Sequence, residues 1–266
     1  MKNKIFIALA IIVVACVGAG VFVTAGDGIE LPKFPFPKLG SSSAKSVAAS
    51  IPAGVTIIEQ SAYEGNDDIT EIIIPEGVTS IGSRAFKDCT NLARVTFPSS
   101  LKTIGLRAFE GCESLTEVIL PSGVSVLPDD VFRGCKALAV FKAEDLNYVS
   151  KNAFKGCSAL TEAAFGENLA VIGVAAFYGC ESLKAADLPS IVKINGYAFY
   201  GCSALTDISF GKNLRNIGSL AFAKCVGLSN VKYGGTISEW GAVSKDRRWA
   251  KGASGLINCA DGGILF

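Results

Sequence analysis

Cysteine is the residue type in this chain with the most obvious capacity for chemistry. The 266 residues contain nine cysteines and no histidine. The lack of histidine excludes Ser-His-Asp and Cys-His activation of a nucleophile, and it excludes any histidine-ligated metal site. The cysteines themselves allow disulfide bonds, metal binding or a reactive thiol. Their spacing decides between these.

Seven of the nine cysteines recur at intervals of 22 or 23 residues. They are Cys89, Cys112, Cys135, Cys157, Cys180, Cys202 and Cys225. These intervals match no zinc signature, which needs close pairs of ligands. Equivalent residues stacked about 4.8 Å apart keep their Cβ atoms near that separation, whereas a disulfide needs about 3.8 Å. We therefore expect a column of buried, unreactive thiols that fill space.

The cysteine column is one part of a longer repeat. An Ala-Phe pair or a close variant begins at Ala62, Ala85, Ala108, Val131, Ala153, Ala176, Ala198 and Ala221. Around it recur a leucine or isoleucine, two apolar residues three and five positions later, often a proline, an aliphatic residue and an Ile-Gly pair. One such unit cannot enclose its own apolar side chains, but stacked units build a continuous core.

The period predicts a leucine-rich-repeat solenoid of about eight repeats of 22–23 residues, with short parallel strands and turns and a cap at both ends. Prolines such as Pro75, Pro98, Pro121 and Pro189 are expected to end the strands, because proline cannot donate to a strand ladder. The glycines of the Ile-Gly pairs are expected to adopt an unusual backbone angle in a tight turn. They are Gly82, Gly105, Gly173 and Gly218. Pro128, Ser150 and Asn195 replace glycine in this column and indicate turns that vary between units.

The sequence outside the repeats divides the chain further. We expect a signal peptide or N-terminal membrane anchor in residues 1–25, a Pro/Ser-rich linker in 26–47, the solenoid in 48–233 and a C-terminal cap in 234–266. In the cap, Trp240, Trp249 and Ile237 are the expected lid residues. Lys245, Arg247, Arg248 and Lys251 are expected to face solvent.

Residues 1–25 predict export in one of three ways. Lys2 and Lys4 precede a long apolar run that ends at Ala25, which fits a cleaved signal peptide. Val13-Val14-Ala15-Cys16 fits a bacterial lipoprotein signal, with Cys16 as the lipidated residue. An uncleaved anchor also fits, since about 20 apolar residues span a bilayer core of ~30 Å.

The combined pattern of Ala-Phe-x-Gly-Cys and Ile-x-Leu/Phe-Pro resembles the BspA-like (Treponema pallidum-type) leucine-rich repeats of bacterial surface proteins and some protists. The resemblance covers about residues 48 to 233. The segment around Trp240, Trp249 and Cys259 is similar to a terminal segment that these proteins often carry. Cys259 is also the one candidate disulfide partner for Cys225, and whether the two pair stays open.

Two rows of residues on the predicted strands point to solvent and form the candidate protein-binding face. The candidate residues are Glu71, Ile73, Arg94, Glu117, Ile119, Val140, Glu162, Asp187 and Asp207. Apolar residues edged by charge suit contact with a protein. A second interpretation is that Glu71, Arg94 and Glu117 form a ladder of alternating charge that stabilises neighbouring strands.

We therefore expect an exported or surface-attached protein–protein interaction module without catalytic activity or a cofactor. The repeated acids lie on an open sheet, whereas an enzyme needs groups that converge in a pocket. The resemblance implies adhesion to host extracellular-matrix proteins or to bacterial surface proteins. Residues 1–25 themselves indicate membrane attachment through the N-terminal segment. A structural scaffold of the cell envelope is the alternative. The formal net charge of +1 does not favour nucleic acid as a partner.

Overall fold

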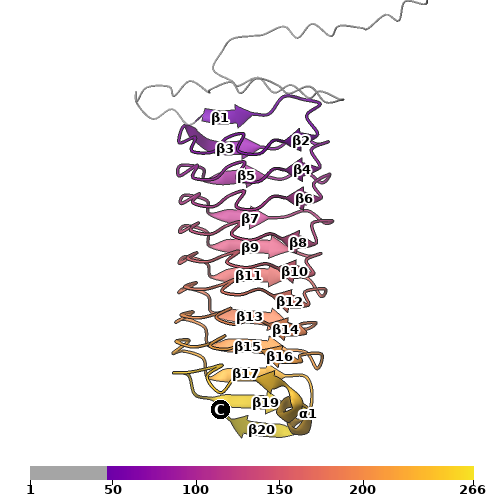
Figure 1. Ribbon diagram of the computed structural model, residues 1–266, viewed down its shortest axis with the longest axis vertical. Coiled ribbons are helices and arrows are strands. Elements are labelled where there is room, and N and C mark those ends of the chain that lie inside the picture. The colour runs from indigo at the N-terminus through magenta and orange to yellow at the C-terminus, as the bar shows by residue number, and fades with distance from the viewer. Residues whose placement is uncertain (1–46) are drawn as a thin grey trace, which may run out of the picture. The chain divides into compact units, whose positions relative to one another are not determined.

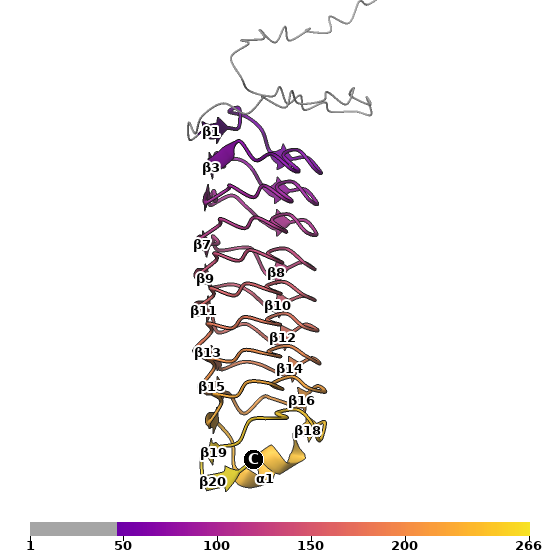
Figure 2. The ribbon, with the colours of Figure 1, turned by 90° about the vertical axis from the view of Figure 1, so that its left-hand side faces the viewer.

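The computed structural model describes residues 47–266, which form a parallel β-solenoid of about nine turns (Figure 1). Each turn, or coil, contributes one longer strand, which we call the wide strand, and one short strand of two residues. The two kinds of strand lie on different sides of the coil (Figure 2). Within this part of the chain, no helix has the length and the hydropathy to cross a membrane. The predicted solenoid of short parallel strands joined by turns is confirmed.

The wide strands share one side and form what we call the strand face. They are β1 (Val47–Ser50), β3 (Ile69–Ile73), β5 (Arg94–Thr96), β7 (Glu117–Ile119), β9 (Val140–Ala143), β11 (Glu162–Phe165), β13 (Ala185–Leu188), β15 (Asp207–Phe210), β17 (Asn230–Tyr233) and β19 (Leu256–Cys259). Their hydrogen bonds group them as β1-β3-β5, β7-β9-β11 and β13-β15-β17-β19-β20, where β20 (Gly262–Leu265) is antiparallel to β19. The prolines predicted to end strands follow β3, β5, β7 and β13 within two residues.

The short strands form a second ladder. They are β2 (Ile57–Ile58), β4 (Ser80–Ile81), β6 (Thr103–Ile104), β8 (Val126–Leu127), β10 (Tyr148–Val149), β12 (Val171–Ile172), β14 (Lys193–Ile194), β16 (Asn216–Ile217) and β18 (Ser244–Lys245).

The short-strand ladder is interrupted between β6 and β8. In other coils the residue after the short strand donates its N–H to the preceding coil, as Gly105 does to the Ile81 carbonyl at 2.7 Å and Ser150 to the Leu127 carbonyl at 3.0 Å. Pro128 occupies this position in the intervening coil and has no N–H. The expected variation between turns is therefore a missing hydrogen bond at Pro128.

Aromatic rings from eight consecutive coils stack along the core. Neighbouring ring centroids are 5.0 to 5.6 Å apart and the ring planes differ by 5 to 20°. The rings belong to Tyr63, Phe86, Phe109, Phe132, Phe154, Phe177, Phe199 and Phe222, and all are buried. Such pairs stabilise a core beyond the apolar area they bury. The Ala-Phe column is therefore the axis of the hydrophobic core.

The cysteine column makes one repeated contact with the aromatic column. Each of the seven thiols donates a hydrogen bond to the backbone carbonyl of the aromatic residue in the preceding coil, at 2.9 to 3.2 Å. All seven are buried free thiols, so the expectation of buried thiols is confirmed. Their role exceeds space filling, because each thiol supplies a donor to a carbonyl in the core. Burial raises the pKa of the Cys89 thiol to about 12.

Two cysteines, Cys16 and Cys259, lie outside the column. Cys259 is half-buried, and both Cys259 and Cys225 are free thiols, so the structure contains no disulfide between them. Cys16 lies outside the described residues.

The glycines after the short strands have a different role from the one expected. Gly82, Gly105, Gly173 and Gly218 do not adopt the left-handed backbone conformation. Instead, a Cβ atom added to Gly105 would lie 2.6 Å from the carbonyl carbon of Gly82 in the preceding coil. The expectation of an unusual angle was wrong, since these glycines are needed for close approach of two backbones.

The left-handed conformation occurs elsewhere in the turn. One such position directly precedes each Ala-Phe pair, with φ between 54 and 59°, and is held by Ser61, Arg84, Arg107, Asp130, Asn152, Ala175, Tyr197 and Leu220. The N–H groups of all but Leu220 donate to carbonyls of the next coil, as Arg84 does to the Leu106 carbonyl at 2.9 Å. These inter-coil hydrogen bonds hold the backbone in a conformation that most of these residue types disfavour. We call the surface that these turns form the turn face.

The C-terminal residues form a ninth coil around a short helix, α1 (Ile237–Ala242). A capping box begins α1, since Glu239 N–H donates to Thr236 Oγ1 and Thr236 N–H donates to Glu239 Oε2. Phe222 N–H donates to the Trp249 carbonyl, whereas in earlier coils it is an alanine or valine carbonyl that accepts this bond. The ninth coil therefore reads Trp249-Ala250 where the others read Ala-Phe.

Two tryptophans cover the end of the aromatic column. Trp249 meets Phe222 edge-on, with centroids 5.8 Å apart, and Trp240 packs against Tyr233 and Trp249. Both tryptophans are buried, and Ile237 is half-buried. Lys245 does not face solvent as expected, because its Nζ donates to the carbonyls of Trp240 and Val243 at 2.7 and 2.9 Å. It thereby satisfies carbonyls at the end of α1.

The contrast between two glycines tests the close packing of the coils. We expect Gly105→Ala to destabilise the fold by more than about 3 kcal/mol, because its Cβ would collide with backbone that cannot move aside. Gly201→Ala is the matched control, since it has φ of 75° but nothing within 4 Å of an added Cβ. We expect it to cost about 1–2 kcal/mol. Urea unfolding measures both, and equal losses would contradict this account.

The burial of the thiol column predicts its reactivity. In the folded protein we expect iodoacetamide to modify Cys259 at least about ten times faster than any column cysteine, because the buried thiols are inaccessible and rarely ionised. In concentrated guanidinium chloride, Cys259 and the seven column cysteines should all react at similar rates. Peptide mapping by mass spectrometry gives the rate at each site. Comparable rates in the folded protein, or a Cys225–Cys259 disulfide, would refute the expectation.

Candidate protein-binding face

The strand face carries the two rows of residues singled out in the sequence. Strand pairing aligns Glu71 with Arg94, Glu117 with Val140 and Glu162, and Asp207 with Asn230 in the first row. The second row aligns Ile73 with Thr96, Ile119 with Lys142, and Asp187 with Ser209. Among the nine candidates, Glu71 and Val140 are half-buried and the other seven are exposed. The structure therefore brings all nine onto one side of the solenoid.

Ion pairs between coils engage some of these candidates. Arg94 Nη2 lies 3.2 Å from Glu71 Oε2, which forms one step of the expected charge ladder. Glu162 pairs instead with Lys142 of the second row, at 3.1 Å. Exposed pairs of this kind contribute at most about 1 kcal/mol each. They show that the charges at these positions are largely neutralised by their neighbours.

Hydrogen bonds engage the candidates on the C-terminal coils. Ser209 Oγ donates to Asp187. Asp207 accepts from Thr206 Oγ1 at 2.7 Å and from Asn230 Nδ2 at 2.6 Å. These bonds, the Thr206 bond foremost, lower the pKa of the Asp207 carboxyl. The C-terminal part of the strand face is thus a network of polar side chains bonded along the solenoid.

The remaining candidates gather on the N-terminal coils. Ile73 and Ile119 are 59% and 54% exposed, which is high for isoleucine, and Thr96 lies between them in the row. Glu117 forms no ion pair within residues 47–266, and Val140 lies beside it. We call Ile73, Thr96, Glu117, Ile119 and Val140 the isoleucine patch.

The turn face carries a charge cluster that the sequence did not reveal. Arg107 lies 3.8 Å from Glu110 and 3.7 Å from Asp130, while Arg133 lies 3.4 and 3.7 Å from the same two carboxylates. Asp130 is buried and also accepts from Asn152 Nδ2 at 3.0 Å. The four groups neutralise one another. Arg107 and Asp130 directly precede the Ala-Phe pair or its variant, and Glu110 and Arg133 directly follow it. The repeat register could therefore have shown that these four residues lie together.

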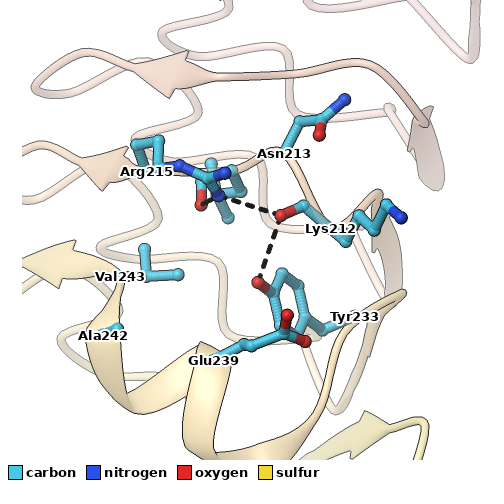
Figure 3. Close-up of a pocket in the computed structure, with 8 residues that line it drawn as sticks. Lys212, Asn213, Arg215, Tyr233, Glu239, Ala242 and Val243 are labelled. Atoms are coloured by element: carbon cyan, nitrogen blue, oxygen red, sulfur yellow. Dashed lines mark hydrogen bonds between the residues drawn. The ribbon is translucent and has the colours of Figure 1, made fainter.

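A cavity of about 380 Å³ lies where the last repeat meets α1 (Figure 3). Two of its polar side chains bond to the protein itself, since Arg215 Nη1 donates to the carbonyls of Lys212 and Leu214 and Tyr233 Oη donates to the Lys212 carbonyl. Glu239 is held in the capping box of α1. These bonds support the junction between the repeats and the cap.

The chain is similar to known proteins in sequence and in structure. The sequence pattern described as BspA type leucine-rich repeat region matches residues 41–158 and 139–244. None of the curated proteins matches the chain. Similar solved structures include the T. pallidum leucine-rich-repeat protein TpLRR (23% identity, 73% of this chain and 76% of that chain, TM-score 0.37). Another is a Faecalibacterium prausnitzii leucine-rich cell surface protein (20% identity, 74% of this chain and 90% of that chain, TM-score 0.32). A third is the pneumococcal vaccine antigen PcpA (16% identity, 77% of this chain and 78% of that chain, TM-score 0.44).

The family match covers most of the chain, and it coincides with the coils that carry the stacked aromatic rings and the buried thiols. The chain belongs to the family of BspA-type leucine-rich-repeat proteins.

Proposed function

We propose that this protein is an exported, non-catalytic protein-binding module of adhesin type, which binds host or bacterial surface proteins through its strand face. Solenoids present extended surfaces that suit large partners. The observation that carries the proposal is the isoleucine patch, in which Ile73 and Ile119 are more than half exposed and Glu117 lies on the same strand as Ile119. Exposed apolar side chains edged by charge suit a protein contact.

The other candidates have a second explanation. Arg94, Glu162, Asp187 and Asp207 are each bonded to a neighbouring coil. This bonding favours a stabilising role for these residues, and it supports the alternative of a structural scaffold of the cell envelope. We therefore assign the contact with a protein ligand to the isoleucine patch.

Substitution of the two isoleucines tests the proposed contact. We expect the double variant Ile73→Thr, Ile119→Thr to bind laminin, fibronectin or collagen at least about tenfold more weakly than the parent does, whichever of these the parent binds. Threonine keeps the strand preference and removes apolar area. Biolayer interferometry with the full chain measures the affinities, and pull-down from envelope fractions tests the scaffold alternative.

Val126→Thr provides the matched control. Val126 is 47% exposed on the short strand β8, away from the strand face, so its replacement should leave binding unchanged. If the parent binds none of the matrix proteins but enriches envelope components, the scaffold function replaces the adhesin function. If the control weakens binding as much as the double variant does, the contact lies elsewhere.

The proposed location is tested by the mature N-terminus. We expect the protein in the envelope fraction or in the medium of the cells that make it, because Lys2, Lys4 and the apolar run up to Ala25 resemble an export signal. Intact-mass measurement then separates cleavage after Ala25, lipidation of Cys16 and a retained anchor. A full-length protein confined to the cytosol would contradict export.

A further inference from the structure

The C-terminal half of the turn face carries a group of aromatic and basic side chains, of which Tyr197 and Lys224 are exposed and the others half-buried. Tyr178 and Tyr200, on consecutive coils, stack with centroids 4.8 Å apart and planes 10° apart. The ring centroid of Tyr197 lies 5.7 Å from that of Tyr200, and Tyr197 is 41% exposed. Lys155 Nζ is 5.2 Å from the Tyr178 ring and Lys224 Nζ is 5.4 Å from the Tyr200 ring. We call these five residues the tyrosine-lysine patch.

The charge of this patch is unbalanced, in contrast to the turn face of the N-terminal coils. On the N-terminal coils, Arg84 pairs with Glu64 and Lys87 with Asp88, and the Arg107 cluster is neutral. Within residues 47–266, neither Lys155 nor Lys224 forms an ion pair. Both ammonium groups lie beside tyrosine side chains and neither is paired with a carboxylate, which leaves positive charge for an anionic partner.

The patch offers side-chain groups and no backbone donors. Gly156 N–H already donates to the Tyr178 carbonyl at 2.8 Å, and Gly179 N–H donates to the Tyr200 carbonyl at 2.9 Å. A peptide that binds by adding a strand needs free backbone groups, and peptide anchors need side-chain pockets. An added Cβ on Gly179 or Gly201 would meet nothing within 4 Å, so the surface beside the tyrosines is open.

From these observations we propose that the tyrosine-lysine patch binds an acidic polysaccharide that carries sulfate or carboxylate groups. The ammonium groups of Lys155 and Lys224 pair with the anionic groups. The tyrosine hydroxyls exchange hydrogen bonds with sugar hydroxyls, and the exposed Tyr197 ring packs against sugar C–H groups. The two lysines lie three coils apart, or about 14 Å at ~4.8 Å per coil, so the ligand runs along the solenoid. This surface differs from the strand face, and the inference does not depend on the proposed protein ligand.

Binding of the full chain to dextran sulfate tests the proposal, with neutral dextran and poly-L-glutamate as comparison probes. We expect binding to dextran sulfate that weakens as salt is added, and no binding to neutral dextran. The double variant Lys155→Ser, Lys224→Ser should lose at least about tenfold in affinity. Tyr197→Asn should lose about threefold or more, and asparagine tolerates the φ of 59° at this position.

Lys232→Ser is the matched control, because it removes one exposed lysine from the strand face. Its affinity for dextran sulfate should match that of the parent. Unaltered thermal unfolding of the patch variants confirms that a loss of binding is local. The proposal fails if dextran sulfate does not bind, if the control loses as much as the double variant, or if neutral dextran binds equally. Tighter binding of poly-L-glutamate would replace the polysaccharide by an acidic peptide.

Discussion

Each coil of this protein depends on the next coil to cover its core. The aromatic ring of one coil stacks on the ring of its neighbour at 5.0 to 5.6 Å, and the thiol of each following coil donates to the carbonyl beside that ring. This spacing follows from hydrogen-bonded strands, which lie about 4.8 Å apart. It also explains the other repeated features. Glycine is needed where backbones meet, and the left-handed turn residues are held by the bonds they make to the next coil.

A stack built in this way exposes its core at an end. The ninth coil solves this problem with the same hydrogen bonds but different side chains. Trp249 takes the position of the alanine in the Ala-Phe pair, and its ring meets Phe222 edge-on, so that the column of parallel rings stops there. Helix α1 brings Trp240 against the same end, and Lys245 satisfies carbonyls at its C-terminus. A lysine that reads as a surface residue thus contributes to the cap.

The surfaces have more freedom than the core, and they divide by region. On the strand face, charged residues of the C-terminal coils bond to their neighbours, whereas isoleucines stay exposed on the N-terminal coils. The turn face shows the opposite arrangement. Its charges are neutralised on the N-terminal coils, whereas lysines without an ion pair lie beside tyrosines on the C-terminal coils. The repeat dictates neither pattern, since both involve positions that change from coil to coil. Function is to be sought at these positions.

The repeat itself could be predicted from sequence, because stacking requires the same residue types at the same place in every coil. The Ala-Phe and cysteine columns and the outward direction of Glu117 and Ile119 follow from that requirement. The sequence could not show contacts that depend on which side chains meet across coils, such as the Arg107 cluster or the pairing of Lys142 with Glu162. It also concealed the ninth coil, because α1 interrupts the period before Trp249. Periodicity determines the register of the coils, and tertiary packing decides which of the non-repeating side chains are neutralised and which remain free to bind.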